Sequence, residues 1–328
     1  MVKGGKPKSG SLGFMPKKRA NRPYPSWTTK PPMKEAKVGE FAGYKVGMTQ
    51  VKMIDDRKGS PTFNQEVVAP CTILEVPPLR VFGIRLYKKD VYGPKVAFDV
   101  LAQELSKELA RRIPAAKKRN RTLAELEKNL EKDGIFSNLH LLVHTQPSKA
   151  GIGKKTPEIF EIGIGGASLK EKLAFAKQKL GNEIPISDVF KEGQLVDVEA
   201  VTKGFGFQGS IKRWHIKRLP HKSQKIRRKV GTLGPWHPHK TRWTVPQMGQ
   251  MGYHNRPEYN KRVLKVSADV KEIVNAAGWK NYGVVRNSFM IINGSVPGTT
   301  KRLVMMRQAL RPYEKERPVV LEEILLKQ

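Results

Sequence analysis

The sequence predicts a mainly β protein with an α/β insertion, a long basic N-terminal arm and a central finger. Runs rich in β-branched and aromatic residues, separated by Gly and Pro, occur near both ends of the chain and indicate strands. Helical spacing of apolar residues is confined to the middle. Two long stretches, residues 1–34 and 200–257, contain many Lys and Arg and no acid, which is not typical of a folded core.

The arm (residues 1–40) is rich in Gly, Pro, Lys and Ser, with scattered aromatic residues. It shows neither helical nor strand periodicity. Such a segment cannot bury a core of its own, so we expect it to be disordered alone and to become ordered on a partner.

Residues 41–94 predict the first part of a β body. Strands are expected at 41–54, 67–76 and 81–87, where β-branched and aromatic residues dominate and Gly and Pro lie between the runs.

Residues 95–184 predict an α/β insertion. One helix is predicted by Phe98, Leu101, Leu105 and Leu109, and a second by Leu123, Leu126 and Leu130. A third begins near Leu169. Capping-box spacing occurs in Thr122 with Glu125 and in Ser168 with Glu171, and Gly181 can end the third helix. Strands are expected at 139–144 and 159–164.

Residues 185–204 predict a further strand of the body. From Leu195 to Val201, apolar residues alternate with Asp197 and Glu199, which predicts one buried face and one solvent-exposed face. After Gly204 the periodicity disappears for about fifty residues, and a structureless excursion of this length is usually functional. We interpret it as a finger (residues 205–257). Strand signals resume in residues 258–328, at 263–266, 284–292 and 303–306.

The charge predicts a polyanionic partner. The formal net charge is +33, and residues 200–257 contain thirteen Lys and Arg without one acid. A solvated surface normally mixes both signs, and nucleic-acid phosphates are the common partner of such a stretch. Cys71 is the only cysteine, so no disulfide forms within one chain. No window has the length and apolarity of a signal peptide or a membrane span, which predicts a cytoplasmic protein.

Gly204, Gly206 and Gly209 spell G-x-G-x-x-G directly after a predicted strand. A dinucleotide-binding fold needs a helix next and an acid about 20 residues on. The segment that follows is basic and interrupted by Pro220, and it contains no acid between Gly209 and Glu258. We therefore expect the glycines to permit tight turns and a close approach of the backbone to phosphate.

The finger holds five of the seven histidines: His215, His221, His237, His239 and His254. One specific hypothesis is a metal site with His237 and His239 as its first two ligands. No Cys or carboxylate lies nearby, and the many cations would oppose another one. Contacts of these histidines with phosphates or bases are the better interpretation.

Trp214, Trp236 and Trp243 lie in the same acid-free stretch. Tryptophan is usually a core residue, but no periodic apolar set accompanies these three. Stacking on a base is worth about 1–3 kcal/mol, and neighbouring cations add attraction to the backbone. This mixture of basic and aromatic residues indicates RNA.

No catalytic arrangement is visible. The finger has no carboxylate to hold magnesium, and Ser210 and Ser223 have a histidine nearby but no acid to orient it. We expect a non-catalytic protein without cofactor, metal or small-molecule substrate. The residues expected to bind RNA are Lys17, Lys18, Arg19, Lys203, Phe205, Lys212, Arg213, Trp214, His215, Lys225, Arg227, Arg228, Lys229, Trp236, His237, His239, Arg242, Trp243, Gln250, His254 and Arg256.

The chain resembles the ribosomal protein L-three family in its archaeal form. The family's spaced signature is matched by Phe190, Asp197, Ala200, Thr202, Gly204, Gly206, Gly209 and Arg213. The strings GSLGFMPKKRA, FAGYKVGMTQV, PPLRVFGIR, GPWHP and GQMGYHNR are also similar to it, so the resemblance covers essentially the whole chain.

This resemblance implies a six-stranded Greek-key barrel and a role in the large ribosomal subunit. Members bind large-subunit rRNA early, help to nucleate assembly and contact neighbouring ribosomal proteins; a homo-oligomer is not expected. The finger would run toward the peptidyl transferase centre, with Trp236 and His237 at its tip and the basic run at residues 227–229 leading to it.

Two positions depart from the family pattern. Phe205 stands where a basic residue is usual, which removes one phosphate contact and favours stacking or packing there. Gln224 stands where eukaryotic members have a histidine, so no role of that histidine carries over. Two alternatives stay open: a free-standing RNA chaperone or regulator that uses the same surfaces, and a histidine metalloenzyme.

Overall fold

A computed structural model describes residues 10–113, 122–130, 136–275, 277–313 and 316–326. The chain divides into two compact units. The basic unit combines Met1–Pro23 with Val201–Arg256, and the body combines Tyr24–Ala200 with Pro257–Gln328. The chain is mainly β, as the sequence predicts.

The first sheet of the body has seven strands in the order β13-β8-β11-β12-β2-β1-β14. Their bounds are β1 Glu40–Ile54, β2 Glu66–Glu75, β8 Leu195–Val201, β11 Asn255–Ser267, β12 Phe289–Asn293, β13 Leu303–Gln308 and β14 Leu321–Leu325. β1 also pairs with β13, so the hydrogen-bonded pairing runs from β1 through β2, β12, β11, β8 and β13 back to β1. The strands predicted at 41–54, 67–76, 195–201, 263–266 and 303–306 are confirmed.

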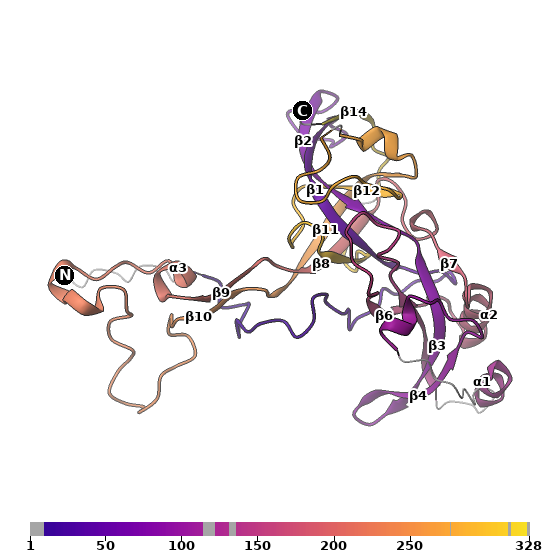
Figure 1. The fold of residues 1–328 in the computed structure, drawn as a ribbon, viewed down its shortest axis with the longest axis horizontal. Coiled ribbons are helices and arrows are strands. Elements are labelled where there is room, and N and C mark those ends of the chain that lie inside the picture. The colour runs from indigo at the N-terminus through magenta and orange to yellow at the C-terminus, as the bar shows by residue number, and fades with distance from the viewer. Residues whose placement is uncertain (1–9, 114–121, 131–135, 276, 314–315, 327–328) are drawn as a thin grey trace. The chain divides into compact units, whose positions relative to one another are not determined.

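The second sheet of the body has five strands and carries the helices. β3 lies between β4 and β5, β6 pairs with β5, and the short β7 pairs with β3. The bounds are β3 Leu79–Asp90, β4 Gly93–Leu101, β5 Phe136–His144, β6 Ile159–Gly163 and β7 Glu183–Ile184, with helices α1 Leu123–Leu130 and α2 Leu169–Lys179. Figure 1 shows α1 and α2 alongside this sheet. The strands predicted at 81–87, 139–144 and 159–164 are confirmed.

The predicted helix through Phe98, Leu101, Leu105 and Leu109 is wrong. Phe98 pairs with Leu86 and Leu101 with Gly83 in the antiparallel β3–β4 ladder. Only a single 3-10 turn, η1 (Leu109–Arg111), follows. Helical spacing of a few apolar residues is a weak signal, and the valines of this segment favour a strand once β3 offers a partner.

The caps of the other two helices are confirmed. The Glu125 N–H donates to the Thr122 hydroxyl oxygen at 3.4 Å, and the Glu171 N–H donates to the Ser168 hydroxyl oxygen at 3.2 Å. The Glu171 carboxylate in turn accepts a hydrogen bond from the Ala167 N–H, which lies just before the helix. Gly181 has a φ of +82° and directly follows Leu180, the C-cap residue of α2, as expected for the end of a helix.

The strand predicted from Val284 starts late, and this part of the prediction is wrong. The N–H groups of Arg286 and Asn287 donate to the buried Glu75 carboxylate, at 2.9 and 3.0 Å, and so are not available to a neighbouring strand. The ladder begins only with Phe289, which pairs with Glu75. Before β12, residues Val270–Ile273 form the 3-10 turn η4.

The prediction of a solvent-exposed face on β8 is wrong for Asp197. Its residue is 1% exposed, and its carboxylate pairs with Arg307 of the neighbouring strand β13. The Arg307 guanidinium lies 3.9 Å from the centroid of the Trp27 ring, and Trp27 is itself buried. The arm therefore covers the face that the alternation assigns to solvent.

The described arm residues, 10–40, contain no helix, and a single bridge at Val38 precedes β1. Its second half is nevertheless fixed to the body. The Tyr24 hydroxyl donates to the Ile159 carbonyl, and the Lys30 ammonium group donates to the Glu40 carboxylate and to the Glu161 carbonyl, each at 2.9 Å. Most buried residues of the two sheets form one apolar core, in which Phe41, Tyr44 and Phe289 are among the largest side chains. Phe82, Leu109 and Leu142 form a second, smaller cluster.

The basic unit contains secondary structure that the lost periodicity did not predict. β9 (Gly204–Gln208) and β10 (Gly249–Gly252) form a two-stranded antiparallel ladder, and Figure 1 shows them side by side. α3 (Ser210–Trp214) follows β9, and the 3-10 segment η3 spans His221–Ile226. Glycines occupy much of the ladder, which is why the pattern of apolar residues gives no strand signal there. No described helix is long and apolar enough to cross a membrane.

Candidate nucleic-acid interface

The three glycines of the G-x-G-x-x-G string lie in the base of the finger. Gly204 and Gly206 belong to β9, and Gly209 caps the five-residue helix α3. A helix does follow the glycines, but β9 pairs antiparallel with β10 and not with a parallel strand. The geometry is that of a hairpin stem, not of a dinucleotide-binding βαβ unit.

Arg213 of α3 holds the base of the finger together. Its Nε donates to the Gln250 carbonyl at 2.9 Å, its Nη1 to the Gln247 carbonyl at 2.8 Å, and its Nη2 to the Lys17 carbonyl at 3.4 Å. One guanidinium thus connects α3, the segment at β10 and the arm. The planar, five-donor shape of arginine suits such a position.

Trp214 is buried beside this arginine, with 2% exposure. Its indole N–H donates to the Gln247 carbonyl at 2.8 Å, and the Lys17 ammonium nitrogen lies 3.8 Å from the centroid of its ring. The structure therefore places Trp214 inside the basic unit, away from solvent, unlike the other two tryptophans of the finger.

The arm runs beside β10. The Ala20 N–H donates to the Tyr253 carbonyl at 2.8 Å, and Nδ1 of His254 lies 2.9 Å from the Lys18 carbonyl. The Arg19 guanidinium lies 5.2 Å from the centroid of the Tyr253 ring. The first half of the arm and the finger, far apart in sequence, thus form one cationic surface.

Several cations meet at this junction, and their pKa values respond to it. Burial lowers the pKa of Lys17, and the charges of Arg213 and Arg256 lower it further. Burial also lowers the pKa of His254, to which Arg256, Lys17 and Arg213 add. The basic unit has no acid to relieve this repulsion. A bound phosphate would relieve it, because each of these cations gains from a nearby anion.

Most of the residues expected to bind RNA are exposed. This group comprises Lys18, Arg19, Lys203, Phe205, Lys212, His215, Lys225, Arg227, Arg228, Lys229, Trp236, His237, His239, Arg242 and Trp243. The structure partly buries Lys17, Arg213, Gln250 and Arg256, and it buries Trp214 and His254. Gln250 donates its side-chain amide to the Gly252 carbonyl, a contact internal to β10.

Aromatic side chains on the finger alternate with the cations. Phe205 is flanked by Lys203 and Lys212, whose ammonium nitrogens lie 5.9 and 5.5 Å from its ring centroid. Trp236 is 80% exposed and Trp243 65%. The Trp236 ring lies edge-on to His239 at 5.6 Å between centroids, which makes a small exposed aromatic cluster.

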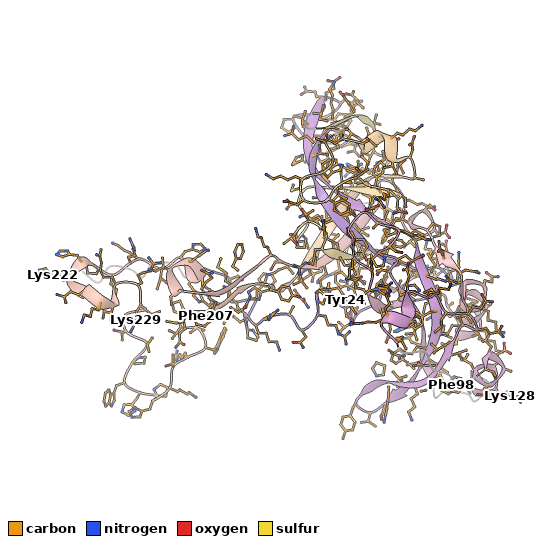
Figure 2. All side chains as sticks on the ribbon, viewed as in Figure 1. Tyr24, Phe98, Lys128, Phe207, Lys222 and Lys229 are labelled. Carbon is orange, nitrogen blue, oxygen red and sulfur yellow. The ribbon has the colours of Figure 1, made fainter. Side chains whose placement is uncertain are left out.

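The structure adds residues that the sequence reasoning did not select. Phe207 is 71% exposed and lies two positions after Phe205 in β9. Its signal was the alternation in GFGFQ. The Arg256 guanidinium lies 4.5 Å from the ring centroid of Phe14, a contact that only the tertiary structure could show. Exposed cations not selected before are Lys217, Arg218, Lys222 and Lys240. Figure 2 shows Lys222 and Lys229 in the same part of the finger.

The rings of His237 and His239 meet edge to face, with their centroids 4.5 Å apart. Among the described residues, no three His, Cys, Asp or Glu side chains come close enough to hold a metal ion.

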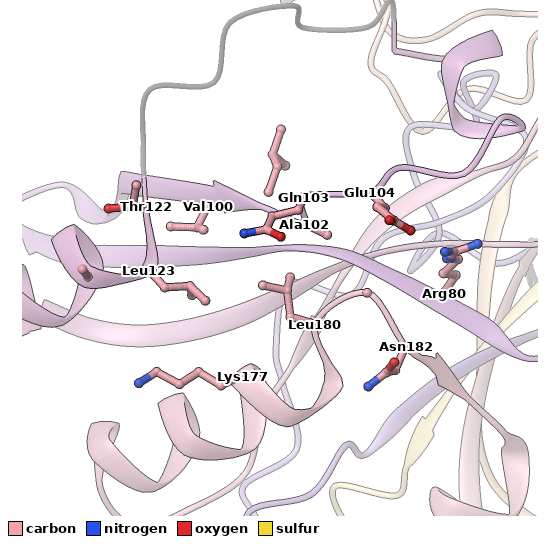
Figure 3. A pocket seen from close by; sticks show the side chains of 13 residues that line it. Arg80, Val100, Ala102, Gln103, Glu104, Thr122, Leu123, Lys177, Leu180 and Asn182 are labelled. Atoms are coloured by element: carbon pink, nitrogen blue, oxygen red, sulfur yellow. The ribbon is translucent and has the colours of Figure 1, made fainter.

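A cavity of about 830 Å³ lies in the body, between β4, α1 and the end of α2. Figure 3 shows Arg80 at one end, Lys177 and Leu123 at the other, and Leu180 between them. Among the described residues that line it, Glu104 is the one acid, and Arg80 and Lys177 are the cations.

Comparison with known proteins identifies the family of the chain. The family model described as ribosomal protein L3 matches residues 1–328. The chain is 46% identical over 310 residues to the large ribosomal subunit protein uL3 of Archaeoglobus fulgidus, covering 94% of this chain and 92% of that protein. It is also 46% identical over 321 residues to the uL3 protein of Methanobrevibacter smithii, covering 96% and 95%. The chain therefore belongs to the ribosomal protein L3 family.

Proposed function

We propose that this chain is a structural, non-catalytic protein of the large ribosomal subunit that binds rRNA through its arm and finger. The observation that carries the proposal is the basic unit, whose described residues form an acid-free surface with exposed cations around exposed aromatic rings. Lys and Arg would neutralise phosphates, and the aromatic rings would stack on unpaired bases. The relatives are named as proteins of the large ribosomal subunit, which supports a location in the cytoplasm, within that subunit, for this chain.

The finer features are part of the proposal. The six strands β1, β2, β12, β11, β8 and β13 would form the Greek-key barrel, which is supported by a pairing that returns to β1. The segments would be 1–40, 41–94, 95–184, 185–204, 205–257 and 258–328, as in the sequence prediction. The finger would reach toward the peptidyl transferase centre with Trp236 at its tip. The protein would bind early, nucleate assembly and contact neighbouring ribosomal proteins as a single copy.

Binding to a transcript of large-subunit rRNA, measured with the full chain at several salt concentrations, tests the proposal. The affinity should fall steeply with salt. In a plot of the logarithm of the binding constant against the logarithm of the salt concentration, each phosphate contact should contribute a slope of about −0.7 to −0.9. Changing Arg227, Arg228 and Lys229 together to Gln should reduce that slope by about 2–3. The matched control changes Lys58, Lys128 and Lys170, which are exposed on the body, and should leave the slope unchanged.

A flat salt response of the unmodified chain contradicts the proposal. Sucrose-gradient fractionation separates it from the alternative of a free-standing RNA chaperone. A subunit protein should sediment in stoichiometric amount with large subunits after a moderate salt wash, whereas a chaperone should remain near the top of the gradient.

A further inference from the structure

The β3–β4 hairpin of the body ends in a turn of unusual composition. Val91 and Tyr92 connect the two strands and are 94% and 100% exposed, and Val96 is 43% exposed. Turns normally consist of Gly, Pro, Asn, Asp or Ser. We name residues 88–96 the hairpin tip. An exposed apolar cluster at the end of a hairpin indicates a contact with another molecule.

The hairpin tip also concentrates positive charge. Lys88 and Lys95 lie directly opposite each other in the ladder, and Lys89 follows on the other face. Like charges in directly opposed positions destabilise a strand pair. None of the three lysines forms an ion pair with any residue that the structure describes. The acid at the tip, Asp90, accepts a hydrogen bond from the Val91 N–H at 2.7 Å.

In the part of the chain that the structure describes, β5 begins at Phe136, which lies opposite Lys88 of β3. Beyond that point the described strands β3 and β4 pair only with each other, and a two-stranded hairpin is marginally stable in water. Figure 1 shows β4 returning beside β3 from this end.

The base of the hairpin, by contrast, is firmly held. Arg85 forms an ion pair with Asp99 across the ladder at 2.7 Å. The Tyr87 hydroxyl donates to the Glu161 carboxylate, and the Tyr87 ring lies 4.8 Å from the His140 ring centroid. A fixed base that presents an exposed ring and three cations is a surface suited to binding.

The chemistry of the tip favours RNA over a protein strand. Pro94 lacks an N–H, and Lys95 is charged, so the edge strand β4 is poorly suited to pairing with another β-strand. An exposed aromatic ring beside unpaired cations is the arrangement that stacks on a base and neutralises the adjoining phosphates. We propose that the hairpin tip is a second RNA contact, separate from the finger, in which Tyr92 stacks on an unpaired base and Lys88, Lys89 and Lys95 face phosphates. This inference rests on the proposed rRNA-binding function.

The experiment measures binding of the full chain to the large-subunit rRNA transcript. Tyr92→Ala should weaken binding about 5- to 150-fold, the equivalent of one lost stacked base. Tyr92→Phe should bind normally, because stacking needs only the ring. Lys88→Gln with Lys95→Gln should lower the salt slope by about 1.4–1.8. The control Lys128→Gln with Lys170→Gln removes the same charge from exposed helix positions and should leave the slope unchanged.

Suppose that Tyr92→Ala and the Lys88 and Lys95 variant bind as the unmodified chain does, while the Arg227, Arg228 and Lys229 variant binds weakly. This result would overturn the inference and leave the proposed function intact. If the finger variant and the unmodified chain show no salt-dependent binding either, the proposed function itself fails. A third result also overturns the inference: Tyr92→Ala leaves RNA binding unchanged but releases a neighbouring protein from isolated subunits. Ultraviolet cross-linking of large subunits should yield a nucleotide adduct on the peptide that contains Tyr92.

Discussion

The Asp197 carboxylate and the Arg307 guanidinium form a buried ion pair between directly opposed positions of β8 and β13, at 3.2 Å. Asp197 also accepts hydrogen bonds from the N–H groups of Asn260 and Leu310, at 3.1 and 3.4 Å. Arg307 donates to the Thr29 carbonyl at 3.0 Å. One pair thus joins the sheet, the C-terminal segment and the arm.

Asp197→Asn should destabilise the body by about 3–5 kcal/mol, because it leaves the Arg307 charge buried without its partner. The free energy of unfolding in urea measures this. Glu35→Gln breaks the exposed pair with Lys37 and should change the free energy of unfolding far less, because solvent screens an exposed pair. Equal effects of the two variants would show that the buried ion pair contributes no more to the free energy of unfolding than the exposed one.

Glu199, two residues along β8, should make stability depend on pH. Burial raises the pKa of its carboxyl group from 4.5 to about 7, although the charge of Arg307 acts in the opposite direction. The folded state therefore holds this proton more tightly than the unfolded state does. Its contribution is full below pH 4.5 and is lost as the pH rises to 7, by about 1–2 kcal/mol after allowance for solvent access.

Glu199→Gln should remove that loss and leave the protein more stable than the unmodified chain above pH 7. Unfolding free energies at pH 5 and pH 8 measure the difference. An identical pH dependence in the two proteins would rule out Glu199 as its source.

Two tryptophans of the finger should respond in opposite ways to replacement by Ala. Trp214→Ala removes a buried ring, a change that costs about 3–5 kcal/mol at buried sites. It should speed amide exchange at Ala20, whose N–H donates to the Tyr253 carbonyl in the same unit. Trp236→Ala should leave that exchange unchanged and weaken rRNA binding or perturb peptidyl transfer. Faster exchange at Ala20 in Trp236→Ala would mean that Trp236 supports the fold.

Two glycines with nearly the same backbone conformation offer a matched pair. Gly252 has a φ of +70° and Gly206 a φ of +68°. A Cβ on Gly252 would lie 2.0 Å from the Lys203 carbonyl oxygen, whereas a Cβ on Gly206 would meet no atom within 4 Å. Both Ala variants bear a left-handed strain of about 1–2 kcal/mol.

Only Gly252→Ala should break the β9–β10 ladder, because the backbone must move to make room. Amide exchange at Tyr253, whose N–H donates to the Lys203 carbonyl at 3.2 Å, reports on the ladder. Similar exchange in the two variants would indicate that the stem can absorb the added methyl group.

Short-range signals in the sequence predicted elements whose partners lie nearby or whose pattern is long. The strand from Leu195 to Val201 and the caps at Thr122 and Ser168 are where they were expected. The segment from Phe98 to Leu109 was misassigned because its pairing with β3 outweighs a local helical spacing.

The candidate interface divides in the same way. Counting charges was enough to predict that the finger and the arm face a polyanion, since a long acid-free stretch has the same charge in any fold. Burial of Trp214, and the junction of Lys17, Arg213 and Arg256, depend on contacts between segments nearly 200 residues apart and leave no local trace.

Composition and motif spacing were enough to predict the mainly β class, the two basic segments and the resemblance to the family, because they are properties of the chain. Which side of each strand is covered depends on tertiary contacts, as at Asp197 and Arg307, where a segment from the arm takes the place of solvent. The tertiary structure also decided that Lys88 and Lys95 lie opposite each other at the β3–β4 tip, because that depends on the register of the two strands. Such long-range contacts are set by packing, which no local pattern encodes.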